Sequence, residues 1–97
     1  MMKIVYESEQ MITETIYDYI DSDELERELQ KVNKNLVVHR ISETKLRVYF
    51  SKKSFLTIDV VFKPEMSFVL EDYKGNKYVS SYNTLKDDII RNIKSEL

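Results

Sequence analysis

Apolar and polar side chains alternate with a period of two through most of the chain between residues 36 and 80. This alternation is typical of strands with one buried face, and it predicts strands over residues 36–41, 46–51, 55–62, 68–70 and 78–80. Only short polar segments separate consecutive strands, so we expect neighbouring strands to pair antiparallel. Pro64 interrupts the pairing before the fourth strand because proline has no N–H to donate. Gly75 in the last turn is free to adopt positive φ.

The two ends of the chain carry apolar residues at helical spacing instead. Residues 12, 16, 19 and 20 share one helical face, residues 25, 29 and 32 share a second, and residues 85, 89, 93 and 97 share a third. Ser8 is a suitable N-cap for the first stretch, and Asp21 or Ser22 for the second. The pattern therefore predicts two N-terminal helices, with one long bent helix over residues 8–33 as the alternative. Residues 3–6 are either a short strand or the lead-in to the first helix.

The C-terminal helix is expected to begin after Thr84 as N-cap, with Asp87 at the position that reaches back to the cap. The element order then predicts an α+β fold in a single domain over residues 1–97: two N-terminal helices, an antiparallel β-meander of four to five strands, and a C-terminal helix. We expect the helices to pack on the sheet face that carries Leu46, Val48, Phe50, Leu56, Ile58, Val60, Phe62, Phe68 and Leu70.

The other face of the predicted sheet is also rich in apolar side chains. It carries Tyr49, Phe55, Thr57, Val61 and Val69, which is too apolar a set for a face fully exposed to water. Either a helix or the N-terminal segment covers this face, or another chain does. A homodimer that uses this face is therefore one hypothesis.

The chain holds few of the residues that known catalytic motifs require. It has no Cys, one His (His39) and one Gly, so nucleophilic triads, thiolate chemistry and glycine-rich phosphate loops are excluded. Asp21 and Asp23 begin like a calcium loop, but the position that requires Gly holds Glu26. We expect a protein that binds rather than catalyses, with no catalytic residue, no cofactor and no metal site.

The sequence also predicts a cytoplasmic location and no membrane association. The first residues contain only a three-residue apolar run, whereas a signal peptide needs about 7–15 apolar residues. No run approaches the roughly 18 residues of a membrane span. The absence of Cys fits a reducing compartment.

Charge divides the chain into two parts. Residues 1–30 carry nine acidic and two basic side chains, a net charge of −7, while residues 31–97 carry thirteen basic and eight acidic ones, a net charge of +5. Like charges one helical turn apart destabilise a helix slightly, so the acidic part is not arranged for helix stability alone. The first hypothesis is a protein partner with a basic surface, bound by the acidic face Glu14, Asp18, Asp21, Glu24 and Glu28. The alternative is that these acids pair with Lys and Arg side chains of the sheet.

Basic side chains suggest a second kind of partner. Bases next to an aromatic ring can hold single-stranded nucleic acid, and here they are Arg40, Arg47, Tyr49, Lys52 and Lys53. The net charge of −2 for the whole chain argues against this alternative, because nucleic-acid-binding domains are usually basic.

In size, composition and acidic helical region, the sequence resembles the small inhibitor proteins of phages and mobile elements, including anti-CRISPR and DNA-mimic proteins. The chain lacks Ala and Trp and is rich in Lys, Ile, Tyr and Asn, as expected of an A/T-rich coding sequence. The resemblance implies an inhibitor that engages a basic surface of another protein through its acidic helices.

Overall fold

The computed structural model describes residues 14–62 and 65–97, and its elements follow the order of an α+β fold. A 3₁₀ turn, η1, and one helix, α2, precede five strands and the C-terminal helix α3. Their bounds are η1 Ile16–Asp18, α2 Ser22–Gln30, β1 Val37–Ser42, β2 Lys45–Tyr49, β3 Phe55–Val61, β4 Ser67–Asp72, β5 Lys77–Ser80 and α3 Leu85–Glu96.

The five strands form one antiparallel sheet in the order β1-β2-β3-β4-β5, which confirms the predicted meander. The register places side chains in rows that cross the sheet. Arg40, Leu46, Ile58, Leu70 and Tyr78 form one such row. Because successive side chains of a strand point to opposite faces, this register decides which residues share a face.

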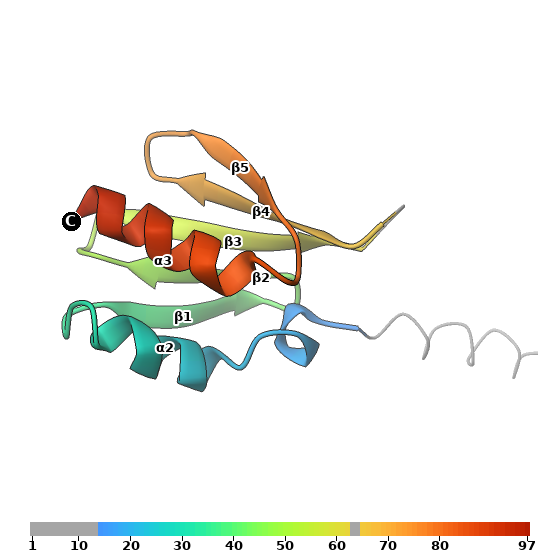
Figure 1. Ribbon diagram of the computed structural model, residues 1–97, viewed down its shortest axis with the longest axis horizontal. Helices are drawn as coiled ribbons and strands as arrows, with labels where there is room; N and C mark the ends of the chain where they lie inside the picture. The colour runs from blue at the N-terminus through green and yellow to red at the C-terminus, as the bar shows by residue number, and fades with distance from the viewer. Residues whose placement is uncertain (1–13, 63–64) are drawn as a thin grey trace, which may run out of the picture.

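One face of the sheet is buried beneath both helices. Figure 1 shows α2 and α3 on the same side of the sheet, with α3 across its middle and α2 beside β1. Leu25 and Leu29 of α2 and Ile89 and Ile93 of α3 join the strand residues in one hydrophobic core. The expected face is confirmed: its buried members are Leu46, Val48, Leu56, Ile58, Val60, Phe68 and Leu70, with Phe50 and Phe62 half-buried at its edge.

The prediction of two N-terminal helices is confirmed for only one of them within the described part of the chain. Of the two expected N-terminal helices only α2 is found among the described residues, and a three-residue 3₁₀ turn replaces the end of the expected first helix. Thr15 caps this turn: its Oγ1 accepts a hydrogen bond from the Tyr17 N–H at 3.2 Å, and its own N–H donates to Asp18 at 2.8 Å. This local cap competes with helix continuation. The expected strand at 3–6, the Ser8 cap and Ile12 lie outside the described residues.

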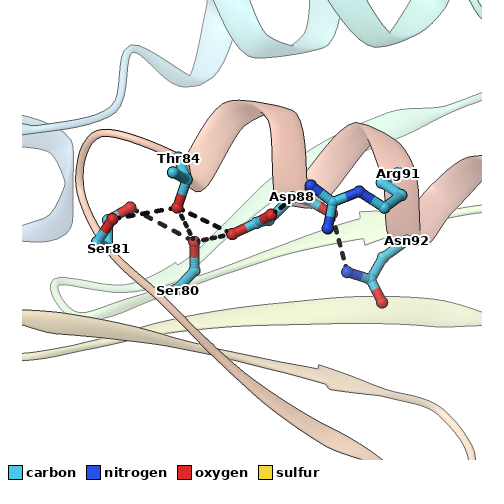
Figure 2. A network of polar contacts seen from close by, with 6 residues as sticks. All are labelled: Ser80, Ser81, Thr84, Asp88, Arg91 and Asn92. Carbon is cyan, nitrogen blue, oxygen red and sulfur yellow. Dashed lines mark hydrogen bonds and ion pairs between the residues drawn. The ribbon is translucent and has the colours of Figure 1, made fainter.

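A polar network fixes the start of α3 to the end of β5 (Figure 2). The buried Ser80 hydroxyl donates to the Asp88 carboxylate at 2.6 Å, and the Thr84 hydroxyl donates to the same oxygen at 3.1 Å. Arg91 adds an ion pair to Asp88 at 2.8 Å. Thr84 is the N-cap residue as predicted, but its side chain accepts no capping hydrogen bond, and the acid that interacts with it is Asp88 rather than Asp87. The Ser80 hydrogen bond, followed by those from Thr84 and Arg91, lowers the pKa of Asp88.

The turn between β4 and β5 uses its glycine as predicted. Gly75 adopts a φ of 94°, which an L side chain rarely tolerates. The Asp72 carboxylate accepts hydrogen bonds from the backbone N–H groups of Lys74 and Asn76, both at 2.9 Å. Burial raises the pKa of Asp72, but the donors of Asn76 and Lys74 together outweigh it and leave the pKa lowered.

Candidate binding surfaces

A groove of about 560 Å³ lies between the η1–α2 segment and the start of α3. Three of the five predicted acidic residues, Asp18, Asp21 and Glu24, line this groove. Tyr17, Tyr19 and Tyr82 line it as well, and Lys86 is the one basic residue among the described residues that line it. We call this surface the acidic groove. The sequence hypothesis placed these acids on one helical face, whereas the structure gathers them by the turn at Tyr19 and Ile20 that joins η1 to α2.

Two acidic residues of the groove also stabilise the starts of η1 and α2. The Asp21 carboxylate accepts hydrogen bonds from the N–H groups of Asp23 and Glu24, at 3.0 and 3.2 Å, and so caps α2. Asp18 completes the cap of η1. Both side chains remain exposed at the groove while they perform this role.

Lys86 of α3 faces the acids of α2 across the groove. Its Nζ lies 3.9 Å from a carboxylate oxygen of Glu24 and 3.2 Å from one of Glu28. Glu28 also pairs with Lys31 at 3.1 Å, and the hydrogen bonds from Lys31 and Lys86 lower its pKa. The predicted pairing of acids with basic residues therefore occurs, but the partners of Glu24 and Glu28 come from the helices and the α2–β1 loop, not from the sheet.

The fifth acid, Glu14, accepts a hydrogen bond from the Tyr19 hydroxyl. This bond, together with burial and the nearby acids, raises the pKa of Tyr19. The Tyr19 ring packs edge-on against Tyr82 at a centroid distance of 5.9 Å and lies 6.1 Å from Phe62. The groove thus joins carboxylates to the rings of Tyr19, the C-cap residue of η1, and Tyr82 of the β5–α3 loop, and Tyr17 of η1 also lines it. Sequence reasoning missed Tyr82, because nothing in its flanking residues marks it as a neighbour of Tyr19.

The predicted basic set is divided between the two faces of the sheet. Arg40 points to the helix side, where its guanidinium lies 4.5 Å from the ring centroid of Tyr17 and its Nε donates to Ser22 Oγ at 3.0 Å. Arg47 and Tyr49 point to the opposite side. Lys52 and Lys53 lie exposed in the β2–β3 turn. Arg40 therefore contributes to the contact between the sheet and α2. The other four residues of the predicted basic set remain available for binding.

Aromatic rings accompany Arg47 on the open side of the sheet. The ring centroid of Tyr49 lies 5.1 Å from that of His39 and 5.4 Å from that of Phe55. The Arg47 guanidinium lies 4.4 Å above the Phe55 ring, and its Nε donates to Thr57 Oγ1 at 3.1 Å. We call this surface, His39, Arg47, Tyr49 and Phe55, the aromatic face. Strand alternation placed Phe55 on this side of the sheet, within the homodimer hypothesis, but His39 was included in no binding hypothesis although the same alternation could have placed it there.

A second groove, of about 410 Å³, adjoins the aromatic face at the end of the sheet where the β2–β3 turn lies. Val37, Tyr49 and Phe50 supply its apolar walls, and His39 and Lys52 supply polar atoms. The pairs Val37–Tyr49 and Tyr49–Phe55 are direct neighbours across the strands, so the groove continues the row of rings.

Comparison with protein-family models, with curated proteins and with solved structures gave no match. Among residues 14–62 and 65–97, no three His, Asp or Glu side chains gather as ligands for a metal ion. In the same residues, no helix combines the length and the apolar character needed to cross a bilayer. The function therefore has to be inferred from the two surfaces themselves.

Proposed function

We propose that this chain is a non-enzymatic protein-binding module that engages a basic surface of another protein through the acidic groove. The observation that carries the proposal is the convergence of Asp18, Asp21 and Glu24 on one concave surface that three tyrosines also line. An inhibitory role of the kind found in small phage and mobile-element proteins fits this mode of binding.

The chemistry of the groove suits a Lys or Arg side chain of the partner. Carboxylates supply charge complementarity, which speeds association and disfavours acidic partners. A tyrosine face attracts a cation by about 0.5–1 kcal/mol at an exposed site, and the alkyl part of a long basic side chain packs against the ring. The exposed Tyr82 and the half-buried Tyr19 provide such rings beside the acids.

The balance of charge at the groove also supports a cationic partner. Lys86 offsets one acid at most, and it is already shared between Glu24 and Glu28. Its distance of 3.9 Å from Glu24 is at the limit of an ion pair, and both side chains are about half exposed. Such a contact contributes little and is readily exchanged for a contact with a partner.

The test is capture of a partner from nuclease-treated lysate of the source cells, with wild-type protein and two double variants. Glu24→Gln with Tyr82→Ala removes one charge and one ring from the groove without touching a cap. Asp23→Asn with Tyr73→Ala is the matched control, since it removes the same groups from positions that do not line the groove. Far-UV circular dichroism and urea unfolding establish that each variant is folded.

We expect a protein that is captured by the wild type and by the control variant, and lost with the groove variant. Equal capture by both folded variants would contradict the proposal. So would the absence of any partner once nucleic acid has been digested.

A further inference from the structure

The side of the sheet opposite the helices forms a second surface, independent of the acidic groove. His39, Arg47, Thr57, Glu71 and Lys77 make one row across all five strands on this side. Both α2 and α3 lie on the other face (Figure 1), so no helix of the described residues covers this row. Val79, at the β5 edge of the same side, is 76% exposed.

The charged side chains of this surface that lie near the aromatic face are basic. The sequence holds no Asp or Glu between residues 29 and 42 or between residues 44 and 58, while those segments include Arg47, Lys52 and Lys53. The nearest acids across the strands are Glu71, which pairs with Thr57, and Asp59, which is engaged by Lys45 at 3.8 Å. An anionic ligand would therefore meet little repulsion at the end of the sheet formed by the β2–β3 turn.

The aromatic face also offers flat stacking surfaces. Tyr49 stands between the rings of His39 and Phe55, and the Arg47 guanidinium lies over the Phe55 ring. Arg47 is held in this position by the bond to Thr57 and by a 3.4 Å bond from Nη1 to the Tyr49 hydroxyl. Nucleobases stack on aromatic rings and on guanidinium planes, and each stacked base contributes about 1–3 kcal/mol.

The neighbouring groove matches the size and polarity of one nucleotide. Its volume of about 410 Å³ and its apolar walls of Val37, Tyr49 and Phe50 suit a base. Lys52 at its margin provides a cation for the phosphate that follows the base. An apolar peptide would fill the walls but would leave the cations without partners.

We propose that the aromatic face and its groove bind single-stranded nucleic acid. Bases stack on Tyr49, His39 and the Arg47–Phe55 pair, and phosphates contact Arg47, Lys52 and Lys53. Duplex does not fit this mode, because its bases are already paired and stacked. The acidic groove lies on the helix side, so this binding does not depend on the proposed protein partner.

The experiment is fluorescence anisotropy of the full chain with a labelled, mixed-sequence DNA strand of about 12 nucleotides, its RNA counterpart and the matching duplex. Three phosphate contacts predict a slope of about −2 for log affinity against log salt. Tyr49→Ala should weaken binding at least about fivefold. Lys52→Gln with Lys53→Gln should reduce the slope by about 1.4.

The matched control is Lys74→Gln with Lys94→Gln, which removes the same charge from the β4–β5 turn and from α3. This variant should bind the single strand as the wild type does. The proposal is overturned if the duplex binds as tightly as the single strand, if the control variant loses as much affinity as the turn variant, or if no binding occurs at about 20 mM salt. A dimer by light scattering that Tyr49→Ala dissociates, without strand binding, would assign the face to a second copy of the chain.

Discussion

The acidic groove and the aromatic face differ in what their charged side chains do inside the protein. In the groove, Asp18 and Asp21 cap helical segments, and Glu24 faces a lysine of α3. On the aromatic face, Arg47 donates hydrogen bonds to its neighbours Thr57 and Tyr49, and Lys52 lies exposed in the adjoining turn. Loss of Asp18 or Asp21 is therefore expected to change folding and binding together, whereas loss of a base in the second region is expected to change mainly binding.

This difference determines which substitutions are informative. A general charge reversal of the acidic residues would remove two caps and so confuse unfolding with loss of a partner. Glu24 and Tyr82 avoid this difficulty, because neither caps a helix. The two regions can then be separated by comparing stability and binding for each variant.

The largest loss of stability is expected from breaking the polar network at the start of α3, the helix that forms one side of the acidic groove. Asp88→Ala removes the acceptor of the buried Ser80 hydroxyl and of Thr84, and it should lower the free energy of unfolding by about 2 kcal/mol. The exposed neighbour Asp87→Ala should change it by less than about 0.5 kcal/mol. Urea unfolding measures both. Equal losses for the two variants would show that the network of Figure 2 does not hold α3 in place.

The next largest effect is expected from comparing a charged residue of the acidic groove, Asp21, with one beside the aromatic face, Lys52. Asp21→Ala removes the N-cap of α2 and should cost about 1 kcal/mol of stability. Lys52→Ala, in the β2–β3 turn, should leave stability within about 0.5 kcal/mol of the wild type. Urea midpoints test the pair. If the lysine variant is the less stable of the two, the contrast between the regions is wrong.

Acid should weaken the protein through its carboxylates. The pKa values of Asp88, Asp72 and Glu28 are lowered in the folded state, so protonation favours the unfolded chain. Their contribution is present above the unfolded pKa of about 4 and is lost as pH falls through the lower folded values. Urea midpoints measured from pH 6 down to about pH 2 should fall, and less steeply for Asp88→Asn. An unchanged slope in this variant would contradict the role given to Asp88.

The smallest effect on stability is expected for Glu24→Gln. Its contact with Lys86 is long and exposed, so the free energy of unfolding should change by less than about 0.5 kcal/mol. Isothermal unfolding in urea checks this value. A larger loss would mean that Glu24 serves the fold, and the partner-capture experiment would then need Tyr82→Ala alone.

Period-two alternation was sufficient to predict most of the sheet. The strands around Leu46, Ile58 and Phe68, their antiparallel order and their buried face all follow from the alternation and the short turns. The N-terminal region could not be predicted as well. Apolar residues at 16, 19 and 20 fit a helix, but the Thr15–Asp18 cap and the contact of Ile16 with Glu43 favour a 3₁₀ turn. These interactions are formed in place of a helix, and the helical spacing of the apolar residues gives no indication of them.

The candidate surfaces were predictable only in part, because they depend on tertiary contacts. The sequence identifies Asp18, Asp21 and Glu24 as acidic neighbours, but Tyr82 joins them through the packing of α3. Arg40 and Arg47 are equivalent in sequence terms. Strand alternation assigns the two arginines to opposite faces only after the register of β1 is known, and Arg40 then lies on the helix side, beside Tyr17 and the start of α2.

The most direct measurement of the central claim is site-specific photocrosslinking in the source cells. The photoreactive residue p-benzoylphenylalanine replaces either Tyr82, which is 55% exposed in the acidic groove, or Tyr73, which is 41% exposed in the β4–β5 turn. We predict a crosslinked protein from position 82 and none from position 73, with the attached peptide carrying Lys or Arg. Crosslinking from position 73 alone would contradict the acidic groove as the binding surface.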